Sequence, residues 1–114
     1  MARISSHVLD SVRGSHAAGI RCQLFRLGDD RQLVFDVVAD DEGRIAEEIA
    51  IEAGKPAVEF ELVLHSVDYF SAQGMAVDSA LKTVVLRFVV EDPDARYHMP
   101  VMLAPHAYSA WWSV

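Results

Sequence analysis

Hydrophobic and polar residues alternate along several segments of the chain, a pattern typical of a β-strand with one buried face. In AVEFELVLH, from Ala57, apolar side chains occupy every second position, with glutamates between them. The same period of two runs through LKTVVLRFVVE, from Leu81, and through IRCQLFRL, from Ile20. The segments RQLVFDVVAD, RYHMPVML and AYSAWWSV are also predicted to be extended. The positions expected to face the core are Ile20, Cys22, Leu24, Val58, Phe60, Leu62, Leu64, Val84, Leu86, Phe88 and Val90.

Short polar turns separate the predicted strands, because glycine, aspartate and proline favour the backbone angles of turns. These turns are Gly28-Asp29-Asp30, Asp40-Asp41-Glu42-Gly43, Gly54-Lys55-Pro56 and Glu91-Asp92-Pro93-Asp94. Strands of about five to eight residues with such turns between them are typical of an antiparallel β-sandwich. We therefore predict an all-β fold in a single domain over residues 1–114.

Two segments have helical features. SVDYFSAQG begins with Ser66, a possible N-cap, and ends with Gly74, a residue suited to the position after a helix. DEGRIAEEIAIEAG, from Asp41, has good helix propensity, but its isoleucines fit a loop followed by a short strand equally well. Both interpretations of this second segment stay open.

Composition excludes several classes of protein. The content of 52% hydrophobic and 24% charged residues is that of an ordinary globular chain. No apolar run approaches the roughly 20 residues that span a bilayer, and MARISSHVLD lacks the apolar centre of a secretory signal. A formal net charge of −7 argues against a nucleic-acid partner. The single cysteine, Cys22, excludes an internal disulfide and favours a reducing, cytoplasmic location.

Five histidines raise the question of a metal site, and they are His7, His16, His65, His98 and His106. None forms an HxH or HxxxH pair, so we predict no metal. The chain also lacks a glycine-rich phosphate loop, a nucleophile elbow and a paired-carboxylate motif. A hydrolase built from this sequence would use histidine and arginine to activate a bound water.

Three of the polar residues have unusual local surroundings. His7 lies in ISSHVLD among strand-forming and small residues, where a buried imidazole needs a partner. His98 directly precedes Met99-Pro100, and proline interrupts a strand, so we expect irregular backbone there, as is common beside functional pockets. Arg44 ends the acidic turn DDEGR. Taken singly, each residue fits a structural or solvated role better than a catalytic one.

Together these segments resemble the signatures of the transthyretin-like 5-hydroxyisourate hydrolases. ISSHVLDSVRGSHAAGIRCQLFRL resembles the family's N-terminal signature, which begins with Ser/Thr-His-Val-Leu-Asp. DEGR resembles the second motif, and HSVDYFSAQG fits the family's single short helix. VVLRFVVEDPDARYHMPVMLAPHAYS resembles the C-terminal signature with its Tyr-His-Val-Pro-like element. The resemblance runs in consistent order from Ile4 to Ser109, nearly the whole chain.

The resemblance implies a fold, an assembly and an activity. The family fold is a sandwich of two four-stranded antiparallel sheets, and its members are homotetramers with a channel between two dimers. Its enzymes open the cyclic amide of 5-hydroxyisourate, formed by urate oxidation, without metal or cofactor. Carried over by position, the catalytic residues are His7, Arg44 and His98. We expect the two histidines to share the general-base and substrate-orienting roles and Arg44 to hold the anionic ring.

The C-terminal tetrapeptide departs from the family pattern. The hydrolases end in Tyr-Arg-Gly-Ser, and the aligned residues here are Trp111, Trp112, Ser113 and Val114. We expect Trp111, Trp112 and Ser113 to contact substrate, although tryptophans packed between dimers are an equally good interpretation. Three hypotheses follow: a hydroxyisourate hydrolase that tolerates the change, an enzyme retuned to another planar cyclic amide or imide, or a binding protein for an aromatic ligand. Vertebrate transthyretin, a carrier, has lost the hydrolase pattern at its other sites, so the retained pattern here favours an enzyme.

Overall fold

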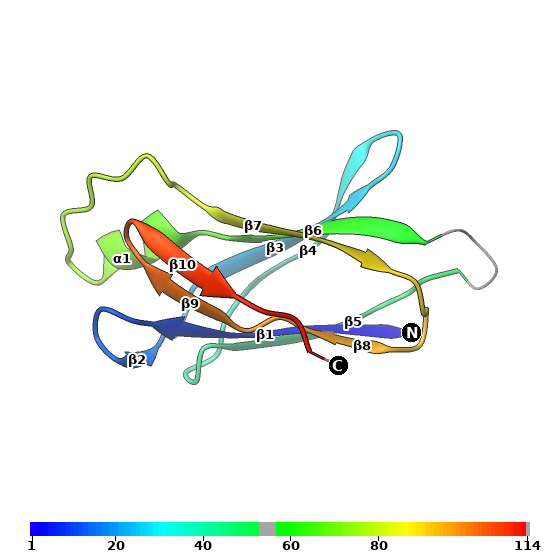
Figure 1. Cartoon of the computed structure of the whole chain (residues 1–114), viewed down its shortest axis with the longest axis horizontal. Helices are drawn as coiled ribbons and strands as arrows, with labels where there is room; N and C mark the ends of the chain where they lie inside the picture. Colours follow the sequence, from blue (N-terminus) through cyan, green and yellow to red (C-terminus); the bar gives the residue numbers. More distant parts are fainter. Residues whose placement is uncertain (53–56, 114) are drawn as a thin grey trace.

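The computed structural model describes residues 1–52 and 57–113, which form two packed β-sheets with one short helix at one end (Figure 1). The elements are β1 (Ala2–Asp10), β2 (Ser15–His16), β3 (Arg21–Leu27), β4 (Arg31–Val38), β5 (Arg44–Ile49), β6 (Val58–Leu64), α1 (Ser66–Ala72), β7 (Val84–Val90), β8 (Arg96–His98), β9 (Val101–Ala104) and β10 (Ala107–Ala110). The predicted sandwich with a single short helix is confirmed. No helix in the described residues is long and apolar enough to cross a membrane.

One sheet has the predicted form of four antiparallel strands, in the order β4-β3-β6-β7. Its register aligns Leu24, Leu62 and Leu86 across three neighbouring strands. Leu24 and Leu62 are buried and Leu86 is half-buried, so the alternating pattern correctly identified the face that packs on the core. Phe60 and Phe70 are among the largest fully buried side chains of that core.

The other sheet is mixed, so the prediction of two four-stranded antiparallel sheets is wrong for it. β1 pairs antiparallel with β5 and β2 along one edge, and parallel with β8 and β9 along the other. The chain enters β8 by crossing from the opposite sheet, so no hairpin forces an antiparallel direction. Pro100, which has no N–H to donate, separates β8 from β9. The irregular backbone predicted beside His98 is therefore confirmed.

Local corrections concern the ends of elements. His65, not Ser66, is the N-cap of α1, and Ser66 instead donates from Oγ to the carbonyl of Lys82. Gly74 follows the helix with a φ of 84°, as predicted. The segment from Asp41 forms a turn and then β5, so its helical interpretation is wrong.

The C-terminal strand is shorter than predicted. β10 ends at Ala110, and Ser113 forms an isolated bridge with His98. The predicted turn Gly54-Lys55-Pro56 and the last residue of the tetrapeptide, Val114, lie outside the described residues.

Buried Asp10 fixes the end of β1. Its Oδ1 accepts hydrogen bonds from the backbone N–H groups of Val12 and Arg13, and its Oδ2 accepts one of 2.8 Å from the Tyr69 hydroxyl. Burial and this hydrogen bond raise the pKa of Tyr69 to about 12. Asp10 therefore joins helix α1 to the turn that leads from β1 into β2.

The turn before β5 positions Arg44. The Asp40 carboxylate accepts hydrogen bonds of 2.9 Å from the backbone N–H groups of Glu42 and Arg44. Gly43 has a φ of 71°, and its carbonyl accepts a 2.8 Å hydrogen bond from the N–H of Val8. A Cβ at position 43 would lie 2.3 Å from the Val8 carbonyl oxygen, so only glycine fits here.

We predict that Gly43→Ala lowers the free energy of unfolding by at least about 2 kcal/mol, since it adds a backbone clash to an unfavourable positive φ. Gly14→Ala is the matched control, because Gly14 has a φ of 68° but open space around the added methyl group. Urea denaturation of both variants measures the difference. Equal losses of stability would contradict the role assigned to the close approach of Gly43 and Val8.

Candidate active site

The outer face of the mixed sheet gathers the three residues predicted to be catalytic. Along β1, Ser6 and Val8 are buried, whereas Ser5 and His7 are only half-buried on the opposite face. The strand register places Arg44 of β5 opposite His7, and His98 of β8 opposite Ser5. Cross-strand partners share a face, so residues from three strands meet within one two-residue repeat of β1.

Ser5 orients His98 at this face. Oγ of Ser5 and Nδ1 of His98 are 2.8 Å apart, in hydrogen-bond contact. The backbone of His98 also exchanges two hydrogen bonds with Ser113, of 3.0 and 2.8 Å. The structure therefore brings Ser113, one of the predicted substrate-contacting residues, beside His98. Ser5 was missed at the sequence level, although its spacing of two from His7 already placed both on one strand face.

His16 is a second residue that sequence reasoning missed. The tight connection from β1 to β2 pairs Leu9 with His16. This pairing brings Nδ1 of His16 to 3.1 Å from Nε2 of His7, with the ring centroids 5.2 Å apart. Gly14 favours a turn at this point, but a turn residue does not reveal the register of the resulting hairpin.

The surroundings keep both central imidazoles neutral near pH 7. Burial, followed by the positive charge of Arg44 and by His16, lowers the pKa of His7 below its usual value of 6.5. Burial and Arg44 also lower the pKa of His98. A neutral imidazole has a free lone pair, so this face is suited to accept protons.

Arg44 keeps its guanidinium available to a ligand. Its side chain is about half exposed, and it meets Glu42 only at 3.7 Å, in an exposed ion pair. Exposed pairs of this kind contribute little to stability, so exchanging Glu42 for an anionic ligand costs little. A planar guanidinium can hold such a ligand through two parallel hydrogen bonds.

The tryptophans lie elsewhere in the single chain. Trp111 and Trp112 are 52% and 61% exposed. With Met99 they border a shallow hollow against strand β7 of the opposite sheet. Within one chain the structure therefore joins Ser113, but not Trp111 or Trp112, to the face that carries His7 and His98.

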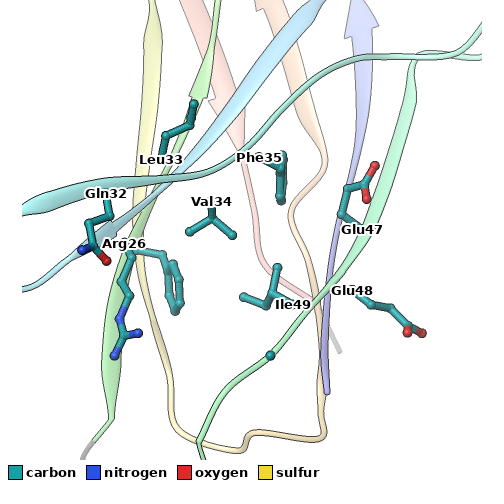
Figure 2. Close-up of a pocket in the computed structure, with 10 residues that line it drawn as sticks. Arg26, Gln32, Leu33, Val34, Phe35, Glu47, Glu48 and Ile49 are labelled. Atoms are coloured by element: carbon teal, nitrogen blue, oxygen red, sulfur yellow. The ribbon is translucent and has the colours of Figure 1, made fainter.

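A second hollow, of about 420 Å³, opens between β4 and β5 (Figure 2). Apolar side chains line it together with charged ones, among them Val34, Phe35, Ile49, Arg26 and Glu47. None of the residues predicted to act in catalysis borders it. A third hollow, of about 410 Å³, lies beside His16 and is lined by Leu9 and Met102 among others. This third hollow is the one that adjoins the histidine pair.

In the described residues, no group of three or more histidine, cysteine, aspartate or glutamate side chains converges. His65 lies between β6 and α1, and its Nε2 is 2.7 Å from Oε1 of Gln23 in the neighbouring strand β3. His106 is exposed in the turn between β9 and β10. The outer face itself presents the imidazoles of His7 and His98, the guanidinium of Arg44 and the hydroxyl of Ser5.

Two solved structures have the same fold. The chain superimposes on a Klebsiella pneumoniae 5-hydroxyisourate hydrolase with a TM-score of 0.82 at 26% identity, and each chain is covered completely. It superimposes on an (S)-allantoin synthase with a TM-score of 0.83 at 28% identity. The match covers 99% of this chain but only 44% of the synthase, so this fold also occurs as part of a longer protein.

Sequence comparison gives relatives of nearly equal length. A protein of Rhizobium meliloti named 5-hydroxyisourate hydrolase 2 is 39% identical over 96% of this chain and 93% of its own length. A 5-hydroxyisourate hydrolase of Deinococcus radiodurans is 37% identical over 95% and 92%, respectively. The family model of transthyretin and the related hydrolases matches residues 4–112. With the sandwich, the matched length and the residues on its outer face all in agreement, the chain belongs to the HIUase/Transthyretin family.

Proposed function

We propose that this chain is a 5-hydroxyisourate hydrolase that works with His7, Arg44 and His98. The observation that carries the proposal is the register of β1, which aligns His7 with Arg44 and Ser5 with His98 on one face. Relatives that match over nearly the whole chain bear this enzyme name, as does the Klebsiella pneumoniae structure. The site is formed by groups that hold an anion and accept protons, which are the groups that hydrolysis of an anionic cyclic amide requires.

The reaction follows from these groups. A water oxygen adds to the ring carbonyl carbon while a neutral histidine takes one of its protons, a step that contributes about 10²–10⁴-fold. The resulting oxyanion collapses, the ring C–N bond breaks, and the leaving nitrogen takes up a proton. The lowered pKa values of His7 and His98 keep both rings in the base form at neutral pH. Arg44 holds the planar anionic ring and offsets the charge that develops on the oxygen.

We propose that Ser113, Trp111 and Trp112 contact the substrate, although only Ser113 lies beside His98 within one chain. The backbone of Ser113 is hydrogen-bonded to the backbone of His98, which places Ser113 beside this histidine. The exposed apolar surface of the two tryptophans favours contact with a ligand or with a second chain. If a ligand makes this contact, Trp112 stacks on its planar ring, and a related cyclic amide or imide becomes the second candidate substrate. The alternative to an enzyme is a protein that binds an aromatic ligand without turning it over.

We also propose that the chain assembles as a homotetramer in the cytoplasm. Its exposed apolar side chains include Val85 on β7 and Trp111 and Trp112 of the C-terminal segment, and these three line one hollow. Such a surface is typical of an interface between subunits. The one cysteine, Cys22, is buried as a free thiol, which suits a reducing compartment.

We expect the wild-type protein to accelerate the decay of freshly generated 5-hydroxyisourate. We expect the His98→Ala variant to have a kcat/KM at least about 10²-fold lower. The lost imidazole removes a proton acceptor and the contact with Ser5. Ultraviolet absorbance follows the decay, and light scattering should give a tetrameric mass for both proteins.

His106→Ala is the matched control, because His106 is exposed in a turn and should leave kcat/KM unchanged. A wild-type rate equal to spontaneous decay would contradict the proposed substrate. Tight ligand binding with no turnover, indifferent to His7→Ala, would support the binding protein instead.

A double substitution tests whether the tetrapeptide sets specificity. Trp112→Arg with Val114→Ser restores the cation and hydroxyl of the family pattern, and we expect it to raise kcat/KM for 5-hydroxyisourate severalfold if the tryptophan has retuned the site. Comparison with Trp112→Leu separates the gain of the cation from the loss of the ring. If the double variant gains nothing, substrate choice is set by other residues.

A further inference from the structure

His16 forms a hydrogen-bonded pair with His7 that the catalytic roles assigned so far do not use. Nδ1 of His16 is 3.1 Å from Nε2 of His7, and the rings are tilted by 35°. A neutral imidazole carries one N–H and one bare nitrogen, so one ring must donate and the other accept. The direction of this bond decides where the free lone pair lies.

The Glu42 backbone indicates the direction. A hydrogen bond with this backbone raises the pKa of His7, opposing the effect of burial. The N–H of Glu42 already donates to Asp40, so the carbonyl oxygen is the group that meets His7. A carbonyl only accepts, and Nδ1 is the ring nitrogen of His7 left to donate to it. Nε2 of a neutral His7 is then bare and accepts the Nδ1–H of His16.

This arrangement leaves Nε2 of His16 as the accessible base. His16 is exposed, and it lines the hollow of about 410 Å³ that Leu9 and Met102 also border. A water in that hollow can reach His16, whereas both ring nitrogens of His7 are already engaged. The free electron lone pair of the two histidines therefore lies on Nε2 of His16, on the open side of the sheet.

Charged groups around the pair come from every neighbouring element. Arg44 of β5 and His98 of β8 disfavour a positive charge on His7. The backbone hydrogen bonds of Asp40, together with the nearby Arg44 and His16, lower its pKa and keep its carboxylate ionised near the pair. His7 therefore gives up an added proton readily.

We propose that His16 is an additional catalytic residue that relays a proton from the attacking water to His7. The water O–H bond breaks as Nε2 of His16 gains the proton, and the Nδ1–H of His16 passes to Nε2 of His7. The hydroxide oxygen bonds to the ring carbonyl carbon. His7 is left as an imidazolium that donates to both Glu42 and His16, and the proton returns along the pair to the leaving ring nitrogen. The relay rests on the proposed hydrolase function.

Substitution and rescue test the relay. His16→Asn keeps a hydrogen-bonding group near the position of Nδ1 but has no basic nitrogen in place of Nε2, and His16→Phe keeps only the ring volume. We expect both to lower kcat by about 10²-fold, and imidazole added to His16→Gly to restore turnover in a saturable manner. His106→Asn serves as the control and should keep wild-type kcat. Full activity of His16→Asn, or no rescue by imidazole, would overturn the relay.

Nitrogen-15 NMR of the free protein provides a readout that needs no substrate. At a pH where both rings are neutral, we expect His16 to carry its hydrogen on Nδ1 and to leave Nε2 bare. A hydrogen on Nε2 of His16 would overturn the relay even in an active enzyme. A wild-type protein without hydrolase activity but with the expected hydrogen positions would instead contradict the proposed function, and the relay with it.

Discussion

The hydrogen-bonded register of β1 is the constraint on which the active face depends. β1 is the central strand of its sheet, with partners along both edges, so its position is fixed from two sides. A shift by one residue would turn His7 into the core and expose Val8. It would also separate His7 from Arg44 and Ser5 from His98. Burial of one face of the strand thus holds the chemistry on the other.

The turn at Gly43 and the hydrogen bonds of Asp10 stabilise the register of β1. Gly43 allows the turn before β5 to approach Val8 closely. The hydrogen bond from the N–H of Val8 to the carbonyl of Gly43 then aligns Arg44 with His7. Two residues further along β1, buried Asp10 links the Tyr69 hydroxyl to the turn that leads to His16. The residues proposed as anion clamp and base, Arg44 and His7, are therefore positioned by ordinary hydrogen bonds of the backbone around them.

Much of this organisation could be predicted from the sequence. Period-two alternation identified the core face of β3, β6 and β7, and Met99-Pro100 located the interruption beside His98. The parallel pairing of β8 and β9 could not be predicted, because alternation describes one strand and says nothing of its partner or direction. The roles of Ser5 and His16 were not predicted for the same reason, because their contacts with His98 and His7 depend on the strand register. Ser66 was wrongly predicted as the N-cap because its hydroxyl bonds to Lys82 instead.

A double-mutant cycle on His7 and His98 tests most directly whether the β1 register joins them in one site. kcat/KM for 5-hydroxyisourate is measured for the wild type, His7→Gln, His98→Gln and the double variant. Groups that act on the same reacting ring are strongly non-additive, so the double variant should be little slower than the slower single variant. Effects that simply multiply, with all four proteins equally folded, would show that the two histidines act independently and would contradict a single site on this face.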